Sequence, residues 1–457
     1  MADEVRLIDI IDEFISGDWG EEYATEDAPC AVSCVRGADI VPISNSRFEN
    51  IPVRYISASS LKNRGLSEGN IIIEKSGGSP TQSTGRTVYV SKKLVEAKKN
   101  IVCSNFCQAF RIKEGWNPLY VYYYLQVVYN SGVFFNFEGK TSGLKNLILD
   151  SAFQSITIKK VPLEEQDRVA NMLSLIDDKI AANHAINDYL EAMARQLYDY
   201  WFVQFDFPDK NGKPFKSSGG EMVWNEKLKR EIPVGWKDGQ LIDISSITMG
   251  QSPDGSSYNE TGDGILFYQG STDFGIRFPS VRQYTNSPTR FAKKGDILMS
   301  VRAPVGAVNI ANNDCCIGRG LAALNSKIGS LTHLYFIIRD LKTAFDNKNA
   351  VGTTFGSITK DELYSLPVVI PSTNVIERFE NMCSPVFERQ MIIGKEIDDL
   401  ISQREELLPL LMNGQVSVKQ LNNHLSELDG LILRNVVGFA TQGIFQNCLY
   451  KVICSKV

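Results

Sequence analysis

The chain has few of the residues that carry catalytic chemistry. Its three histidines, His184, His333 and His424, do not stand near a cysteine or another plausible group of metal ligands. Neither a Walker phosphate-binding loop nor a Gly-x-Gly-x-x-Gly motif is present. Pro208-Asp209 and Pro253-Asp254 could each begin a nuclease motif, but no Asp/Glu-x-Lys follows within about forty residues. We therefore predict a chain that is not an enzyme by itself and holds no metal.

The cysteines also favour structure over chemistry. Their odd number, nine, and an acidic first segment unlike a secretion signal together predict reduced thiols and a cytoplasmic protein. Cys30-x3-Cys34 and Cys103-x3-Cys107 could be joined in one zinc site. However, their spacing differs from the usual two-residue knuckle, and both pairs lie in apolar, strand-like sequence. No run of eighteen apolar residues is found, so we expect no membrane span.

Several polar loops with nearby cations suit DNA binding. Residues 75–80 form a Gly- and Ser-rich loop after a strand-like run, residues 250–258 form a second, and residues 351–355 form a third. In such loops glutamine could read adenine and arginine could read guanine. A plain turn, a phosphate contact or a surface residue is the alternative reading at each position. The candidate DNA contacts are Lys75, Ser76, Ser79, Arg86, Gln251, Ser252, Tyr258, Arg302, Arg319, Thr353 and Thr354.

The charge of the chain is segregated, although its total of −5 argues mildly against nucleic acid. Residues 1–39 hold two basic and eleven acidic residues. In contrast, residues 47–113 hold twelve basic and four acidic residues, and residues 277–342 hold ten and three. Phosphate contacts need local positive potential rather than a positive total, so the two basic segments are candidate polyanion-binding surfaces. Two ordinary solvated surfaces would have the same composition.

An internal repeat organises the sequence. Leu7-Ile8-Asp9-Ile10 recurs as Leu241-Ile242-Asp243-Ile244, and the run 69–73 is echoed by the run 295–299. Arg36-Gly37-Ala38-Asp39 is echoed in the same way by residues 269–273. Landmarks that keep their order while their offsets drift indicate a duplication with changes in loop length.

Each repeat ends in a segment with the pattern of a long helix. Positions from 169 to 201 follow each other at four and three residues, and adding 210 gives matching positions from 379 to 411. This spacing predicts a coiled coil; two amphipathic helices packed on their own domains are the alternative. Pro385 predicts that the second helix is broken and begins anew near Ser384. The stripe includes Leu173, Ile176, Ile180, Leu190, Leu197, Val386, Ile393, Ile397, Leu400 and Leu407, with the polar residues Asn183, Asn187, Gln390 and Arg404 expected to set the register.

The predicted fold class is mixed α/β. Two α/β domains are expected to be separated by a pair of long antiparallel coiled-coil helices, as a pseudo-two-fold internal repeat. The expected boundaries are 1–160 for the first domain, 161–205 for the first helix, 206–238 for a turn-rich linker, 239–370 for the second domain, 371–415 for the second helix, and 416–457 for a tail of unknown role.

Five segments carry a family resemblance. Residues 295–306 read Gly-Asp-Ile-Leu-Met-Ser-Val-Arg-Ala-Pro-Val-Gly, and residues 316–322 read Cys-Ile-Gly-Arg-Gly-Leu-Ala. With Pro162–Gln166, Asn211–Met222 and Leu407–Gly414, they resemble the specificity (S) subunits of type I restriction–modification systems. The apolar tail beyond residue 416 departs from that pattern.

The resemblance implies two target-recognition domains, each reading one half of a bipartite site in double-stranded DNA. It also implies that the helices fix the gap and bind two methyltransferase (M) subunits, with restriction/translocase (R) subunits in the full complex. S-adenosylmethionine, ATP and Mg²⁺ would belong to those partners and not to this chain. Two other hypotheses stay open at this point. One is a coiled-coil adaptor that binds only protein, and the other is a self-contained nuclease or methyltransferase.

Overall fold

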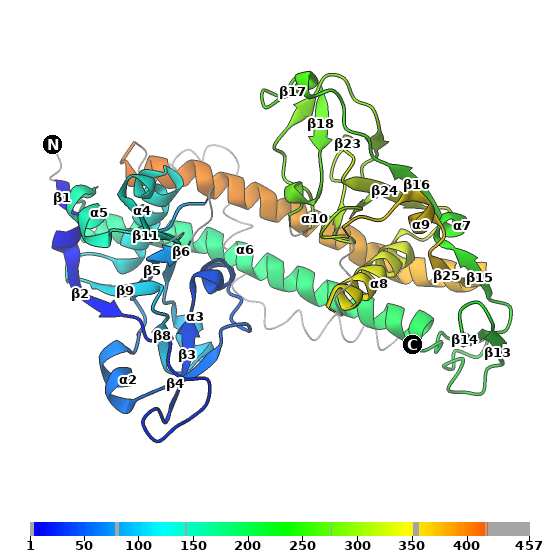
Figure 1. The fold of residues 1–457 in the computed structure, drawn as a ribbon, viewed down its shortest axis with the longest axis horizontal. Coiled ribbons are helices and arrows are strands. Elements are labelled where there is room, and N and C mark those ends of the chain that lie inside the picture. Colours follow the sequence, from blue (N-terminus) through cyan, green and yellow to red (C-terminus); the bar gives the residue numbers. More distant parts are fainter. Residues whose placement is uncertain are drawn as a thin grey trace. The chain divides into compact units, whose positions relative to one another are not determined.

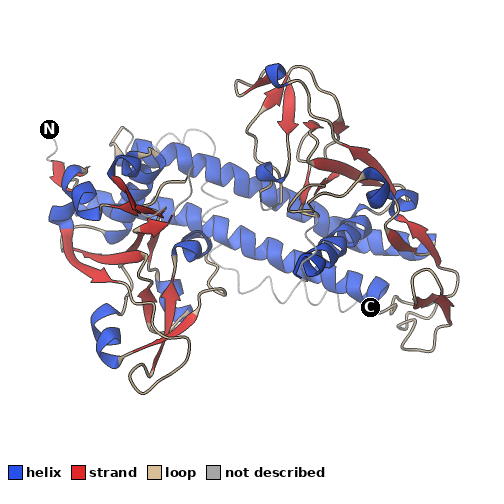
Figure 2. Cartoon of the chain, in the orientation of Figure 1, coloured by secondary structure: helices blue, strands red, loops and turns tan. Residues whose placement is uncertain are grey.

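The computed structural model describes residues 4–77, 82–141, 144–275, 277–350, 356–415 and 418. These residues form two compact units, in which strands and helices are mixed (Figures 1 and 2). Those up to residue 184 and from residue 397 onward make up the first unit, and residues 185–396 make up the second. The mixed α/β class is therefore confirmed.

The first unit contains a four-stranded antiparallel sheet, in the order β2-β9-β5-β7, and a three-stranded sheet, β4-β3-β8, in which β3 and β8 are parallel. Smaller sheets are β1-β12 and β10-β11-β6. The elements are β1 (Glu4–Arg6), β2 (Ile11–Ser16), β3 (Cys30–Val35), α1 (Ile40–Ser44), β4 (Val53–Ile56), α2 (Ala58–Arg64), β5 (Ile71–Glu74), β6 (Ser76–Gly77), β7 (Thr87–Tyr89), α3 (Lys92–Ala97), β8 (Ile101–Cys103), β9 (Cys107–Ile112), α4 (Pro118–Asn130), β10 (Glu138–Thr141), β11 (Leu144–Leu147), α5 (Leu149–Ser155), β12 (Thr157–Lys159) and α6 (Leu163–Tyr198), which continues into the second unit.

The second unit repeats this plan. Its four-stranded sheet has the order β16-β24-β21-β22, and its five-stranded sheet, β17-β19-β18-β23-β20, contains the parallel pair β18 and β23. The elements are β13 (Met222–Asn225), β14 (Arg230–Pro233), β15 (Lys237–Gln240), α7 (Leu241–Ile244), β16 (Ser245–Met249), β17 (Tyr258–Asn259), β18 (Ile265–Tyr268), β19 (Tyr284–Thr285), β20 (Phe291–Ala292), β21 (Ile297–Ser300), β22 (Val308–Ile310), β23 (Cys315–Ile317), β24 (Leu321–Ser326), α8 (Leu331–Ala350), α9 (Lys360–Tyr364), β25 (Pro367–Ile370) and α10 (Thr373–Met412).

The predicted sequence repeats fall on equivalent elements. Both Leu-Ile-Asp-Ile motifs form a short helix in front of an outer strand, β2 in the first unit and β16 in the second. The two buried runs become β5 and β21, which occupy the same place in sheets of the same order. The third pair forms short 3₁₀ helices, Gly37–Asp39 and Ser271–Asp273. The duplication inferred from the sequence is thus confirmed in three dimensions.

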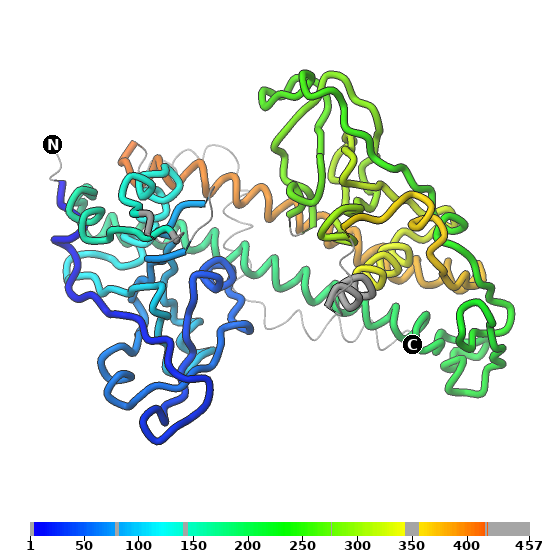
Figure 3. Tube along the Cα trace, viewed as in Figure 1, coloured from blue at the N-terminus to red at the C-terminus, as the bar shows by residue number. Residues whose placement is uncertain are grey.

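The two long helices complete the core of each unit. In the first unit Val169 and Leu173 of α6 are buried in one cluster with Leu408 and Leu411 of α10. Figure 3 shows this orange end of α10 beside the cyan helix α4, and residues of both helices line a common cavity. In the second unit Tyr198 of α6 packs on other residues of α10. Within each unit the later part of one helix meets the earlier part of the other, so the predicted antiparallel pairing is confirmed.

The prediction of a helix break near Ser384 is wrong, because α10 is continuous from Thr373 to Met412. Proline removes one backbone hydrogen bond and crowds the preceding turn. Here Pro385 and Asn381, whose carbonyl group would otherwise accept the missing hydrogen bond, are both exposed residues of α10. The neighbouring Cys383 and Phe387 are buried in the core of the second unit and hold the helix on both sides of the proline.

Candidate nucleic-acid interface

In the second unit, four segments that end or begin strands meet around one polar hollow of about 610 Å³. The residues after β16 and β18, those before β19, and the turn between β23 and β24 contribute its walls. The lining residues are Gln251, Ser252, Pro253, Gly255, Tyr258, Gln269, Arg282, Gln283 and Arg319, and we call this set the polar hollow.

The backbone of the polar hollow is fixed by hydrogen bonds between neighbouring segments. The amide of Gln251 donates to the carbonyl oxygen of Ile317 at 3.0 Å, and that of Gly318 donates to Tyr268 at 2.8 Å. At Gly250 any Cβ atom would lie 2.1 Å from the carbonyl oxygen of Gly318, so only glycine fits this close approach. The side chains of the hollow are therefore presented from a rigid frame.

The loop after β16 is also ordered by its own side chains. Asp254 caps the short helix that follows it, because its carboxylate accepts the amide of Ser256 at 2.9 Å. Hydrogen bonds from Ser256 lower the pKa of Asp254, so this cap is charged at neutral pH. Tyr258 stacks on Phe267 with ring centroids 4.8 Å apart and donates its hydroxyl to Pro253. These contacts hold one wall of the hollow in place.

The polar groups of the hollow suit the edges of bases. Gln269 Nε2 donates to Ser252 Oγ at 3.0 Å, which orients that amide. Arg282 binds the buried carboxylate of Asp273 at 2.9 Å but keeps about half of its side chain exposed, and Arg319 is exposed. Glutamine and arginine side chains pair with adenine and guanine edges in the major groove. The arrangement can bind and discriminate bases, but it contains no nucleophile with a base beside it.

The structure thus brings together four of the predicted contacts, Gln251, Ser252, Tyr258 and Arg319. Arg302 is exposed but does not line the hollow. The predicted contacts Thr353 and Thr354 lie outside the described residues. Sequence reasoning missed three residues, Gln269, Arg282 and Gln283, although the first belongs to a repeat motif and the other two to the basic segment 277–342.

The predicted contacts of the first unit are not gathered in the same way. Ser76 Oγ donates to Asn146 at 2.5 Å within the sheet β10-β11-β6. Lys75 is half-buried next to it, and Ser79 lies outside the described residues. Arg86 binds Glu74 through two hydrogen bonds of 2.6 and 2.9 Å, and this pairing raises the pKa of Arg86. Its guanidinium group is therefore already occupied by a buried carboxylate.

The cysteines that resembled a zinc motif are core residues. Cys34, Cys103 and Cys107 are buried, and burial raises the pKa of Cys34 to about 12 and that of Cys107 to about 11. A thiol must lose its proton to bind zinc. Over the described ranges there is no group of three or more His, Cys, Asp or Glu residues arranged to hold a metal.

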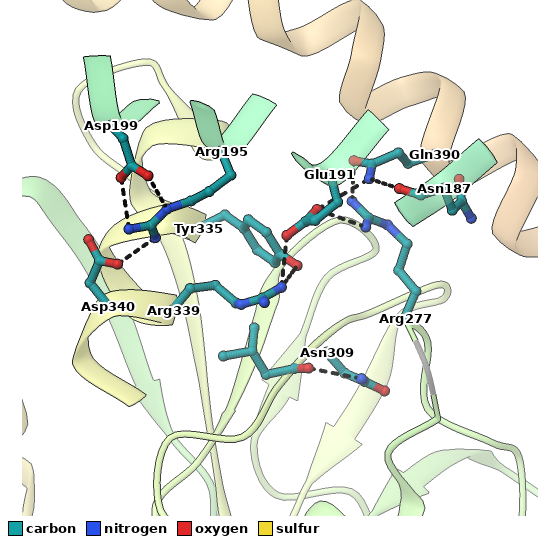
Figure 4. Close-up of polar contacts among 11 residues, drawn as sticks. Asn187, Glu191, Arg195, Asp199, Arg277, Asn309, Tyr335, Arg339, Asp340 and Gln390 are labelled. Carbon is teal, nitrogen blue, oxygen red and sulfur yellow. Dashed lines mark hydrogen bonds and ion pairs between the residues drawn. The ribbon is translucent and has the colours of Figure 1, made fainter. Parts of the chain in front are cut away.

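In the second unit, a polar network joins the strands and α8 to the long helices (Figure 4). Arg277, from the strand domain, donates to Gln390 of α10 at 2.9 Å and lies 3.5 Å from Glu191 of α6. Gln390 donates in turn to the backbone oxygen of Asn187 at 3.2 Å. Arg339 of α8 binds Glu191 at 2.7 Å. Gln390, one of the polar positions of the helix stripe, therefore contacts both Arg277 and the other long helix.

The first unit has its own fastening. Asp177 of α6 accepts hydrogen bonds from Tyr123 of α4 at 2.7 Å and from Arg404 of α10 at 2.8 Å. Gln166, buried at the start of α6, accepts the amide of Asn117, whose side chain caps α4. The Pro-Leu-Glu-Glu-Gln segment therefore joins the start of α6 to the start of α4. No helix in the described ranges has both the length and the apolar character that a bilayer crossing needs.

Comparison with known proteins agrees with this architecture. The family model described as "Type I restriction modification DNA specificity domain" matches residues 42–192 and 233–407, once in each repeat. A Methanocaldococcus jannaschii protein named as the MjaX type I restriction enzyme specificity subunit is 30% identical over 309 residues, which cover 66% of this chain and 69% of the relative. The MjaIX specificity subunit of the same organism is 27% identical over 415 residues, which cover 84% and 88%.

Among solved structures, the type I restriction–modification S subunit from M. genitalium has the same fold, with a TM-score of 0.52 and 14% sequence identity. The alignment covers 90% of this chain and 96% of that one. The chain therefore belongs to the family of type I restriction–modification specificity subunits, the non-catalytic members that supply DNA sequence specificity, and it has two recognition domains.

Proposed function

We propose that this chain reads a bipartite target in double-stranded DNA, one half with each recognition domain. The observation that carries this proposal is the duplicated domain, with a rigid polar hollow in the second copy that presents glutamine and arginine side chains. Two readers joined by helices would recognise two short sequences separated by a fixed gap. In the cytoplasm, such a chain would direct a partner enzyme to those sites.

The partners follow from the same proposal. Methyltransferase subunits would bind the long helices, and restriction/translocase subunits would join them in the full complex. The two Methanocaldococcus jannaschii relatives are named as specificity subunits of type I restriction enzymes, which supports the proposal that this chain works with such partners. S-adenosylmethionine, ATP and Mg²⁺ would be bound by those partners.

The proposed division of labour uses the boundaries expected from the sequence. Residues 1–160 and 239–370 would be the recognition domains, residues 161–205 and 371–415 the spacer helices, and residues 206–238 a linker. The tail from residue 416 has no role in this scheme, and it lies outside the described residues apart from Val418.

The test is co-expression of the chain with a cognate methyltransferase subunit, followed by methylation-sensitive sequencing of the host genome. A bipartite motif with a fixed gap is the expected result. Exchange of residues 1–160 for those of another specificity subunit should change one half of the motif and leave the other half intact. A stable complex whose methylated motif changes in both halves, or not at all, would contradict the proposal.

A further inference from the structure

The polar hollow of the second unit has a counterpart in the backbone of the first unit. Equivalent amides donate to equivalent carbonyl oxygens in the two copies. In the first unit the hydrogen bonds are Asp18 N to Cys103 O (2.8 Å), Ser104 N to Val35 O (2.9 Å), Cys107 N to Ser104 O (2.9 Å) and Lys75 N to Phe106 O (2.8 Å). In the second unit their counterparts, in the same order, are Gln251 N to Ile317 O (3.0 Å), Gly318 N to Tyr268 O (2.8 Å), Leu321 N to Gly318 O (3.0 Å) and Val301 N to Gly320 O (2.9 Å).

Two further features repeat at the same places. A Cβ atom on Gly17 would lie 2.0 Å from the carbonyl oxygen of Ser104, which matches the close approach at Gly250 in the second unit. A buried aspartate, Asp39, accepts the amide of Arg36 at 2.9 Å, as Asp273 accepts the amide of the equivalent Gln269 at 3.1 Å. The frame that presents the reading side chains is therefore present in both copies.

The matching hydrogen bonds define which positions of the first unit are equivalent to lining residues of the polar hollow. Because Ser104 is equivalent to Gly318, the next residue, Asn105, is equivalent to Arg319 of the polar hollow. Asn105 is exposed, as Arg319 is. Phe106 follows it and has 56% of its side chain exposed, so an aromatic ring stands next to the asparagine at the surface.

We propose that Asn105, with Phe106 beside it, is the base-reading element of the first recognition domain. This assignment rests on the proposed function, since it presumes that the domain reads DNA. The asparagine amide offers one donor and one acceptor in the geometry that pairs with the major-groove edge of adenine, and a phenylalanine ring can contact the methyl group of thymine. The first half of the target should therefore contain an A·T pair at the position that Asn105 reads.

The neighbouring residues support a reading role for this turn. Arg64 donates to the backbone oxygen of Gly17 at 3.0 Å and lies 3.4 Å from Asp18, and the side chain of Arg36 is held by Asp39. These two arginines are partly exposed, and their pairing with aspartates fixes their guanidinium groups beside the turn. Asp18 stands where the second unit has Gln251, but its carboxylate is engaged by Arg64, so Asn105 is left as the adaptable polar side chain.

The assignment also changes the role expected of Lys75 and Ser76. Their backbone amides both donate to the carbonyl oxygen of Phe106, at 2.8 and 3.0 Å. These residues therefore support the turn that carries Asn105 and Phe106. The sequence therefore predicted contacts at the right edge of the domain, but it selected Lys75 and Ser76 instead of the neighbouring turn with Asn105 and Phe106.

The test compares Asn105→Ala, Asn105→Arg and the control Asn130→Ala in the complex of the full chain with a methyltransferase subunit. Asn130 is an exposed asparagine of the same domain, at the end of α4. Methylation-sensitive sequencing gives the base preference at each motif position. For Asn105→Ala we expect about a tenfold loss of discrimination at one position in one half of the motif. Asn105→Arg should shift that position toward guanine, and Asn130→Ala should reproduce the wild-type motif.

The outcomes separate this assignment from the proposed function. A bipartite wild-type motif that is unchanged in both Asn105 variants overturns the assignment and leaves the proposed function standing. A wild-type complex without any bipartite motif overturns both. If Asn105→Ala abolishes methylation, the melting temperature and assembly of the complex decide: unchanged values support a reading role, and lost assembly contradicts it.

Discussion

At the scale of single residues, the first unit contains a tightly paired buried charge, that of Glu74. Glu74 has 3% of its side chain exposed and Arg86 has 18%, and the two are joined by two hydrogen bonds. A carboxylate in such a place is stable only with its partner, because removing one member leaves an uncompensated buried charge. This pair lies under the turn proposed to read DNA, since Glu74 ends β5 immediately before Lys75.

Replacement of Arg86 by methionine should therefore destabilise the first unit by about 3 to 5 kcal/mol. Arg6→Met is the matched control, because the Arg6–Asp9 pair is exposed to solvent and should contribute little to stability. Urea unfolding followed by circular dichroism measures both. Equal stability of the two variants would show that Arg86 has no structural role and would return it to the list of DNA contacts.

A buried histidine makes the stability of the second unit depend on pH. His333 packs against Phe202 with ring centroids 4.4 Å apart, and burial lowers the pKa of His333 to about 3. In the unfolded chain a histidine binds its proton near pH 6.5. Between these two values the unfolded state holds more protons than the folded state. The stabilising contribution is therefore complete above pH 6.5 and is lost as the pH falls toward 3.

His333→Phe should remove this dependence. The free energy of unfolding of the wild-type second unit should fall by about 2 kcal/mol more, from pH 7 to pH 5, than that of the variant. Unfolding curves of both proteins at the two pH values measure the difference. Identical changes in the two proteins would mean that His333 is protonated in the folded state.

How far the sequence predicts the residues depends on how local their signal is. Gln251, Ser252, Tyr258 and Arg319 lie in polar loops between strand-like runs, and that pattern is readable from the sequence. Gln269, Arg282 and Gln283 join them only because β18 and β19 pair beside β23. Such pairing between distant segments cannot be read from one sequence. Asn105 becomes visible only through the hydrogen-bond register of the two copies.

At the scale of elements, the 4-3 spacing correctly predicted the buried stripe of the long helices, whereas the proline wrongly predicted a helix break. The buried stripe residues Leu173, Ile180, Ile393 and Ile397 match the prediction. Pro385 shows that packing on both sides can outweigh a lost hydrogen bond. Helix propensity is a local quantity, and tertiary contacts override it where a helix is long and its other face is buried.

Pro385→Ala should then stabilise the protein, because it restores a backbone hydrogen bond without disturbing a buried contact. We expect an increase of about 1 to 3 kcal/mol in the free energy of unfolding. Differential scanning calorimetry would show a higher melting temperature. A lower one would mean that the proline itself is needed, for instance to shape α10.

The buried stripe can be tested with a charge on each side of one helix. Leu400→Arg places a charge among buried residues and should cost about 2 to 4 kcal/mol, whereas Ile392→Arg, at a position 59% exposed, should change stability by less than about 0.5 kcal/mol. Thermal unfolding compares the two. Leu190→Arg, on the other helix, should likewise weaken assembly or alter the spacing of the two half-sites. Normal assembly and spacing in both leucine variants would contradict the spacer role.

At the scale of the whole molecule, the first unit is built from two separate stretches of chain, whereas the described part of the second unit is the single stretch 185–396. The first unit needs α6 residues up to 184 and α10 residues from 397 onward. Leu408, Leu411 and Met412 cover the apolar face of α6 that includes Val169 and Leu173. The sequence repeat predicted the duplication, because each copy kept its landmarks in order. It did not predict that the first unit would include part of each long helix.

A fragment of residues 1–205 should consequently expose that face of α6. We expect it to associate with itself or precipitate, and to become monomeric when a peptide of residues 371–415 is added. Size-exclusion chromatography with light scattering distinguishes these states. A soluble monomer without the peptide would show that the contacts with α10 contribute little to the first unit.

The same division has a consequence for synthesis of the chain. The first unit begins to emerge from the ribosome before the second, yet it lacks Leu408 and Leu411 until the whole described part of the second unit has been made. At about 5 to 20 residues per second, residue 411 follows residue 205 by roughly 10 to 40 s. During that interval the apolar face of α6 in the nascent first unit is uncovered. The first unit is therefore begun before the second unit but completed after it. Binding of a chaperone, or of a methyltransferase partner, to this face of α6 during translation would protect the nascent chain from aggregation.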